Sequence, residues 1–168
     1  PPPPPPVPAA PATRQGPPSE SPASAFSSSK LFAIDVEEFA QYSGIPTVNA
    51  LTDDEHPCQV LTDVFTFQEK LGPIAGKVVT FIGDGACNMP ISWIWAAAKL
   101  GFELRIAAPK NYQPSPELLK RAGGKIIVTE DLKAAASGAD MLYTDVWISM
   151  GKEAESALRL QEMTGYQI

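Results

Sequence analysis

Polar side chains that could bind a small charged ligand stand at three places where helices begin or strands end. His56 and Gln59 flank Pro57 and Cys58 at the expected start of one helix. Asn88 stands at the expected start of a second helix, and Asp145 at the end of an expected strand. Helix N-termini favour anions through their free N–H groups and the helix dipole. A carboxylate at the carboxyl end of a buried strand suits a ligand ammonium, so these residue types fit a ligand with groups of both signs.

Each of these residues also has a simpler structural interpretation. His56 could merely cap its helix, and Asp145 could be a turn or cap residue. Asparagine is a favoured N-cap, so capping is the preferred interpretation of Asn88. The two cysteines of the chain, Cys58 and Cys87, have no second histidine or other base near them in the sequence, which gives weak support to nucleophilic chemistry.

The stretch that organises the rest of the chain covers residues 77–99 and has the pattern of a strand, a glycine turn and a helix. An apolar run over residues 78–82 is typical of a strand buried on both faces of a parallel sheet. Gly83 and Gly85 allow a sharp turn where a side chain would clash. Pro90 suits the first turn of the helix, whose apolar residues recur at helical spacing: Ile91, Ile94, Trp95 and Ala98.

This turn does not fit a dinucleotide site. Asn88 stands where the third glycine of the G-x-G-x-x-G fingerprint belongs. The second strand, near residues 103–107, ends without the acid that would bind a ribose hydroxyl, and Glu103 lies at its other end. No Lys-Ser/Thr pair follows the glycines, which excludes a P-loop.

The remaining pattern alternates strands and helices at short spacing. After a helix at 35–42, a short strand at 45–48 and a helix at 57–71, strands are expected at 78–82, 104–107, 125–129 and 141–146. Helices are expected after each of these strands, the later ones at 116–122, 131–137 and 152–162. This order predicts an α/β fold: one domain with a doubly wound, Rossmann-like parallel sheet.

The N-terminus differs in composition from the rest. Residues 1–29 hold 11 of the 18 prolines, with serine and alanine between them, and are expected to form a disordered tail. A solvated tail is favoured over a ligand for a proline-binding module. The chain of 168 residues carries a formal net charge of −6 with both signs scattered, which argues against nucleic acid as a partner.

Other classes of protein find little support. No apolar run approaches the roughly 20 residues of a membrane helix. The N-terminus lacks the basic-then-apolar order of a signal peptide. The two cysteines provide neither a disulfide framework nor the spacing of metal ligands. We therefore expect no bound metal and a cytoplasmic location.

From about residue 35 the chain resembles ornithine carbamoyltransferases. The resemblance lies in the His-Pro-Cys-Gln motif at 56–59, in the Gly-Asp-Gly turn at 83–85 with Asn88, and in the Asp-Val-Trp-Ile-Ser-Met-Gly motif at 145–151. It implies transfer of the carbamoyl group from carbamoyl phosphate to the side-chain amine of L-ornithine, giving citrulline and phosphate without any cofactor.

The resemblance also implies roles for single residues. His56 and Gln59 match positions that bind the carbamoyl group. Asn88 and Asp145 match positions that hold the amino-acid end of ornithine. Ser149 and Met150 match a mobile loop that closes over it. Full-length members of this family are homotrimers.

The chain departs from the family in ways that bear on activity. Its members have two domains and about twice this length, and their upstream domain carries a Ser-Thr-Arg-Thr phosphate-binding motif that is missing here. A downstream His-Cys-Leu-Pro segment is missing too, and one extra residue stands in the turn before Asn88. Residues 30–55 are therefore interpreted as the remnant of a carbamoyl-phosphate domain, and 56–168 as an incomplete ornithine-binding domain.

Residues 1–168 alone are expected to be inactive. In the first alternative, the chain is a non-catalytic module that binds an amino acid or has a regulatory role. The second is a Rossmann nucleotide binder.

Overall fold

The computed structural model describes residues 33–147 and 156–168. The strands are β1 (Val78–Ile82), β2 (Glu103–Ala107), β3 (Lys125–Thr129) and β4 (Met141–Thr144). The helices are α1 (Ala33–Ser43), α2 (Pro57–Leu71), α3 (Asn88–Leu100), α4 (Pro116–Ala122), α5 (Leu132–Ala136) and α6 (Ser156–Glu162), with a 3-10 turn η1 (Lys110–Tyr112). The tail predicted for residues 1–29 lies outside the described residues.

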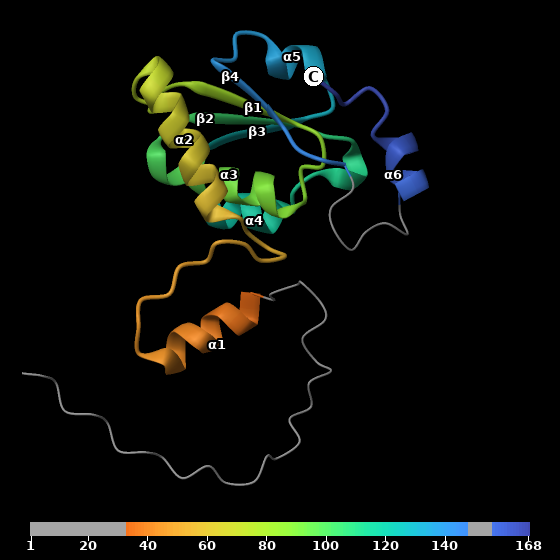
Figure 1. Cartoon of the computed structure of the whole chain (residues 1–168). Helices are drawn as coiled ribbons and strands as arrows, with labels where there is room; N and C mark the ends of the chain where they lie inside the picture. Colours follow the sequence, from red (N-terminus) through yellow and green to blue (C-terminus); the bar gives the residue numbers. More distant parts are fainter. Residues whose placement is uncertain (1–32, 148–155) are drawn as a thin grey trace, which may run out of the picture.

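The four strands form one parallel sheet in the order β3-β2-β1-β4. Helices α3 and α4 lie on one face of this sheet and α5 on the other, with α2 packed beside α3 (Figure 1). The predicted doubly wound α/β fold is thus confirmed. The chain runs outward from β1 through β2 to β3 and then returns to place β4 on the far side of β1. The carboxyl ends of β1 and β4 therefore form the switch point, where open sheets of this kind bind their ligands.

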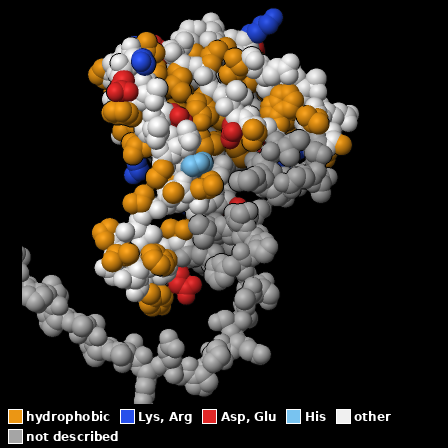
Figure 2. Space-filling view, in the orientation of Figure 1, with side chains coloured by type: hydrophobic (Ala, Val, Ile, Leu, Met, Phe, Trp, Pro, Cys, Tyr) orange, Lys and Arg blue, Asp and Glu red, His pale blue; other side chains and the backbone are white. Residues whose placement is uncertain are grey.

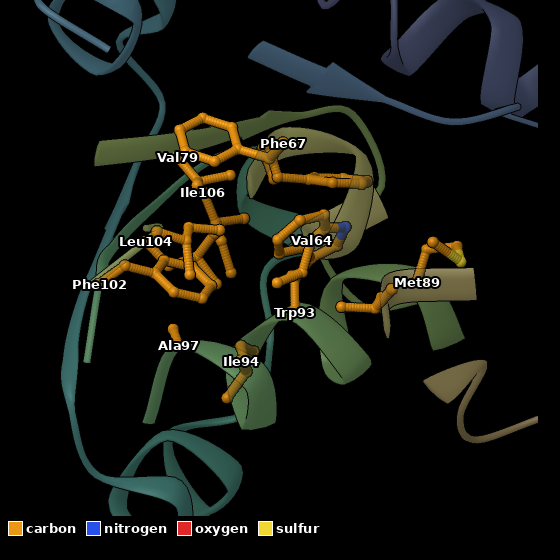
Figure 3. Close-up of a cluster of buried hydrophobic side chains, with 14 residues drawn as sticks. Val64, Phe67, Val79, Met89, Trp93, Ile94, Ala97, Phe102, Leu104 and Ile106 are labelled. Atoms are coloured by element: carbon orange, nitrogen blue, oxygen red, sulfur yellow. The ribbon is translucent and has the colours of Figure 1, made fainter. Parts of the chain in front are cut away.

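The hydrophobic core lies between the sheet and the pair α2 and α3 (Figure 3). Trp93 of α3 is completely buried at its centre. Its ring meets Phe102 edge-on at 5.9 Å between centroids and Tyr143 of β4 at 5.3 Å. Helix α2 contributes Val60, Val64 and Phe67 of its apolar stripe to the core, whereas Leu71, at the end of the same stripe, is exposed. This core fixes the two helix starts that carry the candidate site residues.

The sequence selected the wrong stripe of α3. Ile94 is buried as expected, but Ile91, Trp95 and Ala98 are only partly covered. The residues that face the core are instead Met89, Pro90, Trp93 and Ala97. The cause is that α3 packs between the sheet and α2 while also touching α4, so most of its circumference is apolar and periodicity alone cannot orient it.

Two expected strands differ from the structure. Residues 45–48 form no strand, because none of the described residues offers them a neighbouring strand, and Ile45 and Val48 are 60% and 74% exposed. Strand β4 ends at Thr144 rather than at Val146, because its pairing with β1 ends where Ile82 faces Thr144.

Hydrophobic side chains also gather on the surface around α1 and the segment after it, among them Phe39 and Tyr42 (Figure 2).

Candidate functional site

The turn after β1 brings the chain from the sheet to the start of α3 at the switch point. Gly83 has φ +140°, a conformation that side chains disfavour. A Cβ on Gly85 would lie 2.8 Å from the Ile106 side chain and 2.9 Å from the Tyr112 carbonyl oxygen. Gly83 is therefore required by its backbone conformation, and Gly85 by the close passage of the turn over β2 and η1. Both agree with the sharp turn that the sequence predicted.

The starts of α2 and α3 are held together by Ser92. Its hydroxyl accepts a hydrogen bond of 2.7 Å from the backbone N–H of His56 and donates one of 2.8 Å to the Asn88 carbonyl oxygen. Ser92 is buried, so this link is shielded from water. The structure thus brings two of the candidate regions, which are about thirty residues apart in the sequence, to one place.

His56 occupies the N-cap position of α2, but its side chain makes no capping hydrogen bond. The imidazole Nδ1 is buried and has no hydrogen-bond partner among the described residues. The simple capping interpretation therefore fails for the side chain, which is left with an unused polar atom.

Gln59, in the first turn of α2, is exposed. Its Nε2 donates to Asp63 Oδ1 at 3.0 Å, one helical turn further on. Asp63 in turn lies beside Tyr143 of β4: burial, and then the Asp63 carboxylate, raise the pKa of the Tyr143 hydroxyl. With its N–H group directed to Asp63, the amide of Gln59 has its carbonyl oxygen as the remaining acceptor.

Asn88 is the first residue of α3 and not its N-cap, a position taken by Cys87. The preferred sequence interpretation of Asn88 as a cap is therefore wrong. Its Nδ2 instead donates to the carbonyl oxygen of Thr52 at 3.0 Å, so the side chain reaches toward the segment before α2. This bond occupies one of the two N–H groups of the amide.

Asp145 comes directly after β4 and is partly buried, with Oδ1 accepting a hydrogen bond of 2.8 Å from the Val146 N–H. Its carboxylate and that of Asp84, after β1, both lie near the Cys87 thiol. Burial first, and then the charges of Asp84 and Asp145, raise the pKa of Cys87 to about 12. The ends of β1 and β4 are joined directly, because the Thr144 hydroxyl donates to the Ile82 carbonyl oxygen at 2.9 Å.

A thiol with this pKa should react very slowly. At pH 8 about one Cys87 side chain in ten thousand is ionised when the pKa is about 12. Since the thiolate is the nucleophile, we expect iodoacetamide to label Cys87 far more slowly in the folded chain than in urea. Peptide mass spectrometry at several times would measure this, with the urea-unfolded chain as control. Equal rates in the two states would contradict the assignment.

Several residues of this region were not singled out in the sequence as candidates. Ser92 joins the two helix starts, Asp63 holds Gln59, and Arg159 of α6 forms a buried ion pair with Asp84 at 2.7 Å. The Asp63 contact has a sequence signal, because Gln and Asp four residues apart on a helix are neighbours. The others depend on contacts between distant segments.

The remaining candidates, Ser149 and Met150, lie outside the described residues. Among residues 33–147 and 156–168, no group of three or more His, Cys, Asp or Glu side chains could hold a metal ion. Within the same part of the chain, no helix is long and apolar enough to cross a membrane.

Comparison with known proteins defines the class to which this fold and site belong. The model of the aspartate/ornithine carbamoyltransferase Asp/Orn binding domain matches residues 75–168, and that of the carbamoyl-P binding domain matches residues 27–69. The first match alone covers more than half of the chain. The chain belongs to the aspartate/ornithine carbamoyltransferase family.

Within this family, the similar proteins are ornithine carbamoyltransferases. That of Psychrobacter cryohalolentis is 47% identical over 133 residues, which are 79% of this chain and 43% of the relative. The crystal structure of the anabolic enzyme from Campylobacter jejuni aligns with a TM-score of 0.73 and 40% identity, over 83% of this chain and 48% of that one. The crystal structure of the Thermus thermophilus enzyme aligns with a TM-score of 0.71 and 41% identity, over 83% of this chain and 45% of that one. The resemblance to ornithine carbamoyltransferases is confirmed, and the chain spans less than half the length of these relatives.

Proposed function

We propose that this chain provides the ornithine-binding part of a carbamoyltransferase. In the reaction, the side-chain amine of L-ornithine attacks the carbamoyl carbon of carbamoyl phosphate. A C–N bond forms, the C–O bond to phosphate breaks, and the amine loses a proton. The observation that carries the proposal is the junction at the switch point, where the starts of α2 and α3 are joined through Ser92 and the end of β4, just before Asp145, is bonded to the end of β1 through Thr144.

His56 and Gln59 are assigned to the carbamoyl group. Among the described residues the His56 Nδ1 atom has no hydrogen-bond partner, and the His56 side chain does not cap the first turn of α2. Donors fixed in this way polarise a carbonyl and stabilise the oxyanion that develops during attack. The Gln59 carbonyl oxygen, left over by the bond to Asp63, suits the carbamoyl NH₂ group.

Asn88 and Asp145 are assigned to the amino-acid end of ornithine. The Asp145 carboxylate suits the α-ammonium, and the free N–H of the Asn88 amide suits the α-carboxylate. Ser149 and Met150 are assigned to this end as well, on the sequence motif alone. Residues 56–168 would then form the ornithine domain and 30–55 part of a carbamoyl-phosphate domain. The match to the carbamoyl-P binding domain extends to residue 69 and so includes most of α2; we place the division before α2 because α2 packs against α3.

We propose further that residues 1–168 do not catalyse the reaction by themselves, because they contain no Ser-Thr-Arg-Thr motif to hold a dianionic phosphate. No cofactor is assigned. The homotrimer belongs to the full-length family and is not assigned to this chain. The two free cysteines favour a cytoplasmic location.

Calorimetry with L-ornithine, together with a citrulline assay in the presence of carbamoyl phosphate, tests the proposal. We expect ornithine to bind and no citrulline to form. Citrulline formation would overturn the inactivity of the isolated chain. Absence of ornithine binding would overturn the assignment of Asn88 and Asp145. If a full-length protein that contains this chain also binds ornithine and also forms no citrulline, a non-catalytic amino-acid-binding module would be favoured.

A further inference from the structure

Arg159 of α6 carries a charge that is almost completely removed from water. The residue is 6% exposed, and its Nη1 donates to Asp84 Oδ2 at 2.7 Å. Its guanidinium lies over the Tyr112 ring, 5.1 Å from the centroid. Burial of two charges costs free energy that their attraction often fails to recover, so a buried ion pair is weak evidence for stability. It does fix the relative position of the segments that carry the two charges.

These segments are the ones that leave β1 and β4 at the switch point. Asp84 lies two residues after β1. The same Nη1 of Arg159 also donates to the carbonyl oxygen of Trp147, three residues after β4, at 3.2 Å. One guanidinium group therefore bridges the carboxyl ends of two neighbouring strands.

Each bridged segment carries one of the residues assigned to the amino-acid end of ornithine. Asp84 Oδ1 accepts a hydrogen bond of 3.0 Å from the Ala86 N–H and so orders the turn that leads to Asn88. Trp147 stands two residues after Asp145. The ends of the two strands lie next to each other, since the Thr144 hydroxyl donates to the Ile82 carbonyl oxygen at 2.9 Å.

The base of α6 is fixed independently of this bridge. The Tyr112 hydroxyl donates to Glu162 Oε2 at 2.6 Å, and the completely buried Met163 follows directly after α6. Arg159 therefore extends from a helix that already contacts η1. This contact holds the guanidinium in a defined position between the two segments.

We propose that Arg159 is a positioning residue that sets the distance between Asn88 and Asp145 and thereby the fit of the site for an α-amino acid. The inference rests on the proposed function, because it takes these two residues as the ornithine contacts. Arg159 itself does not need to touch the ligand. The pairing of β1 and β4 ends at Ile82 and Thr144, so without the bridge the residues beyond these ends would be less ordered, and the entropy of ordering them would reduce affinity.

Three variants of the full 168-residue chain test this role by calorimetry with L-ornithine. Arg159→Met removes the charge and should weaken binding at least tenfold. Arg159→Lys keeps a cation with three donors but loses the planar group over Tyr112, so its affinity should lie between those of wild type and Arg159→Met. Arg121→Met is the matched control: Arg121 is exposed on α4, and its guanidinium lies over the Trp95 ring at 5.1 Å. Its affinity should stay within twofold of wild type.

A merely structural role would give a different result. In that case Arg159→Met would lower the unfolding temperature while the folded protein kept wild-type affinity, and the proposal would be overturned. If Arg159→Lys binds ornithine as tightly as wild type and Arg159→Met does not bind it, the proposal is supported, and the positive charge is then sufficient for the positioning role. If Arg159→Met does not fold, Arg159→Lys and Asp84→Asn take its place, and wild-type affinity in both would count against the proposal.

Hydrogen exchange separates this inference from the proposed function. In Arg159→Met, exchange should become faster both at residues 84–88 and at 145–147, relative to Arg121→Met. This readout needs no ligand, so it remains decisive if wild type binds no ornithine and the proposed function fails. Unchanged exchange in both segments would overturn the positioning role even if ornithine binds.

Discussion

Changing Asp145 to asparagine should weaken ornithine binding by roughly 2- to 30-fold. The change keeps the shape of the side chain and removes its charge. Hydrogen bonds to charged groups contribute about 1.5–3 kcal/mol, compared with about 1 kcal/mol for neutral ones. The hydrogen bond from the ligand ammonium is therefore weakened when its acceptor becomes neutral. The partly buried position of Asp145 reduces screening by water and salt. Calorimetry at constant pH and ionic strength measures the effect.

Asp140 provides the matched control for this change. It lies just before the amino end of β4, where it pairs with Lys77 at 3.3 Å and accepts a hydrogen bond from the Val78 N–H at 2.8 Å. Asp140→Asn is the same chemical change on the opposite edge of the sheet, and ornithine affinity should stay within twofold of wild type. Equal losses in both variants would point to a general charge effect, and unchanged affinity in Asp145→Asn would remove this residue from the site.

Changing Trp93 to alanine should have the largest effect on stability. Removal of a fully buried aromatic side chain costs about 3–5 kcal/mol, because transfer free energy is lost and a cavity remains. Trp93 is 0% exposed and loses its edge contacts with both Phe102 and Tyr143. Since domains of this size are stable by only about 5–15 kcal/mol, a large part of the stability should disappear. Urea unfolding followed by circular dichroism measures the change.

Trp95, two residues further along α3, separates the effect of burial from that of residue type. Its ring is only partly covered and lies under the Arg121 guanidinium. Trp95→Ala should therefore cost clearly less, about 1–2 kcal/mol from lost area and the cation–π contact. Equal costs at the two positions would contradict the orientation of α3 and would favour the stripe that periodicity alone suggests.

The sequence by itself determined the local elements and the fold class. The strand over residues 125–129 and the helix over residues 57–71 begin and end where the pattern predicts. The N-cap of α4 is equally local: Ser115 accepts a hydrogen bond from the Leu118 N–H at 3.2 Å. Apolar runs, turn glycines and caps act over a few residues, so the sequence reveals them directly. Their alternation requires a parallel sheet, and the motifs at residues 56–59 and 145–151 indicate the family.

Only the tertiary structure decided which faces and side chains meet. The orientation of α3 could not be predicted because nearly all sides of this helix are covered by different neighbours. The strand expected at 45–48 has local β propensity, but a strand also needs a partner, and propensity does not provide one.

The same reason applies to the candidate site. His56, Gln59, Asn88 and Asp145 could be selected from their positions in the sequence, whereas the residues that hold them could not. Ser92 reaches His56 across 36 residues, and Arg159 reaches Asp84 across 75. The first contact follows from the packing of α2 against α3, and the second from the order of the strands, which brings β4 back beside β1. No local pattern encodes either arrangement.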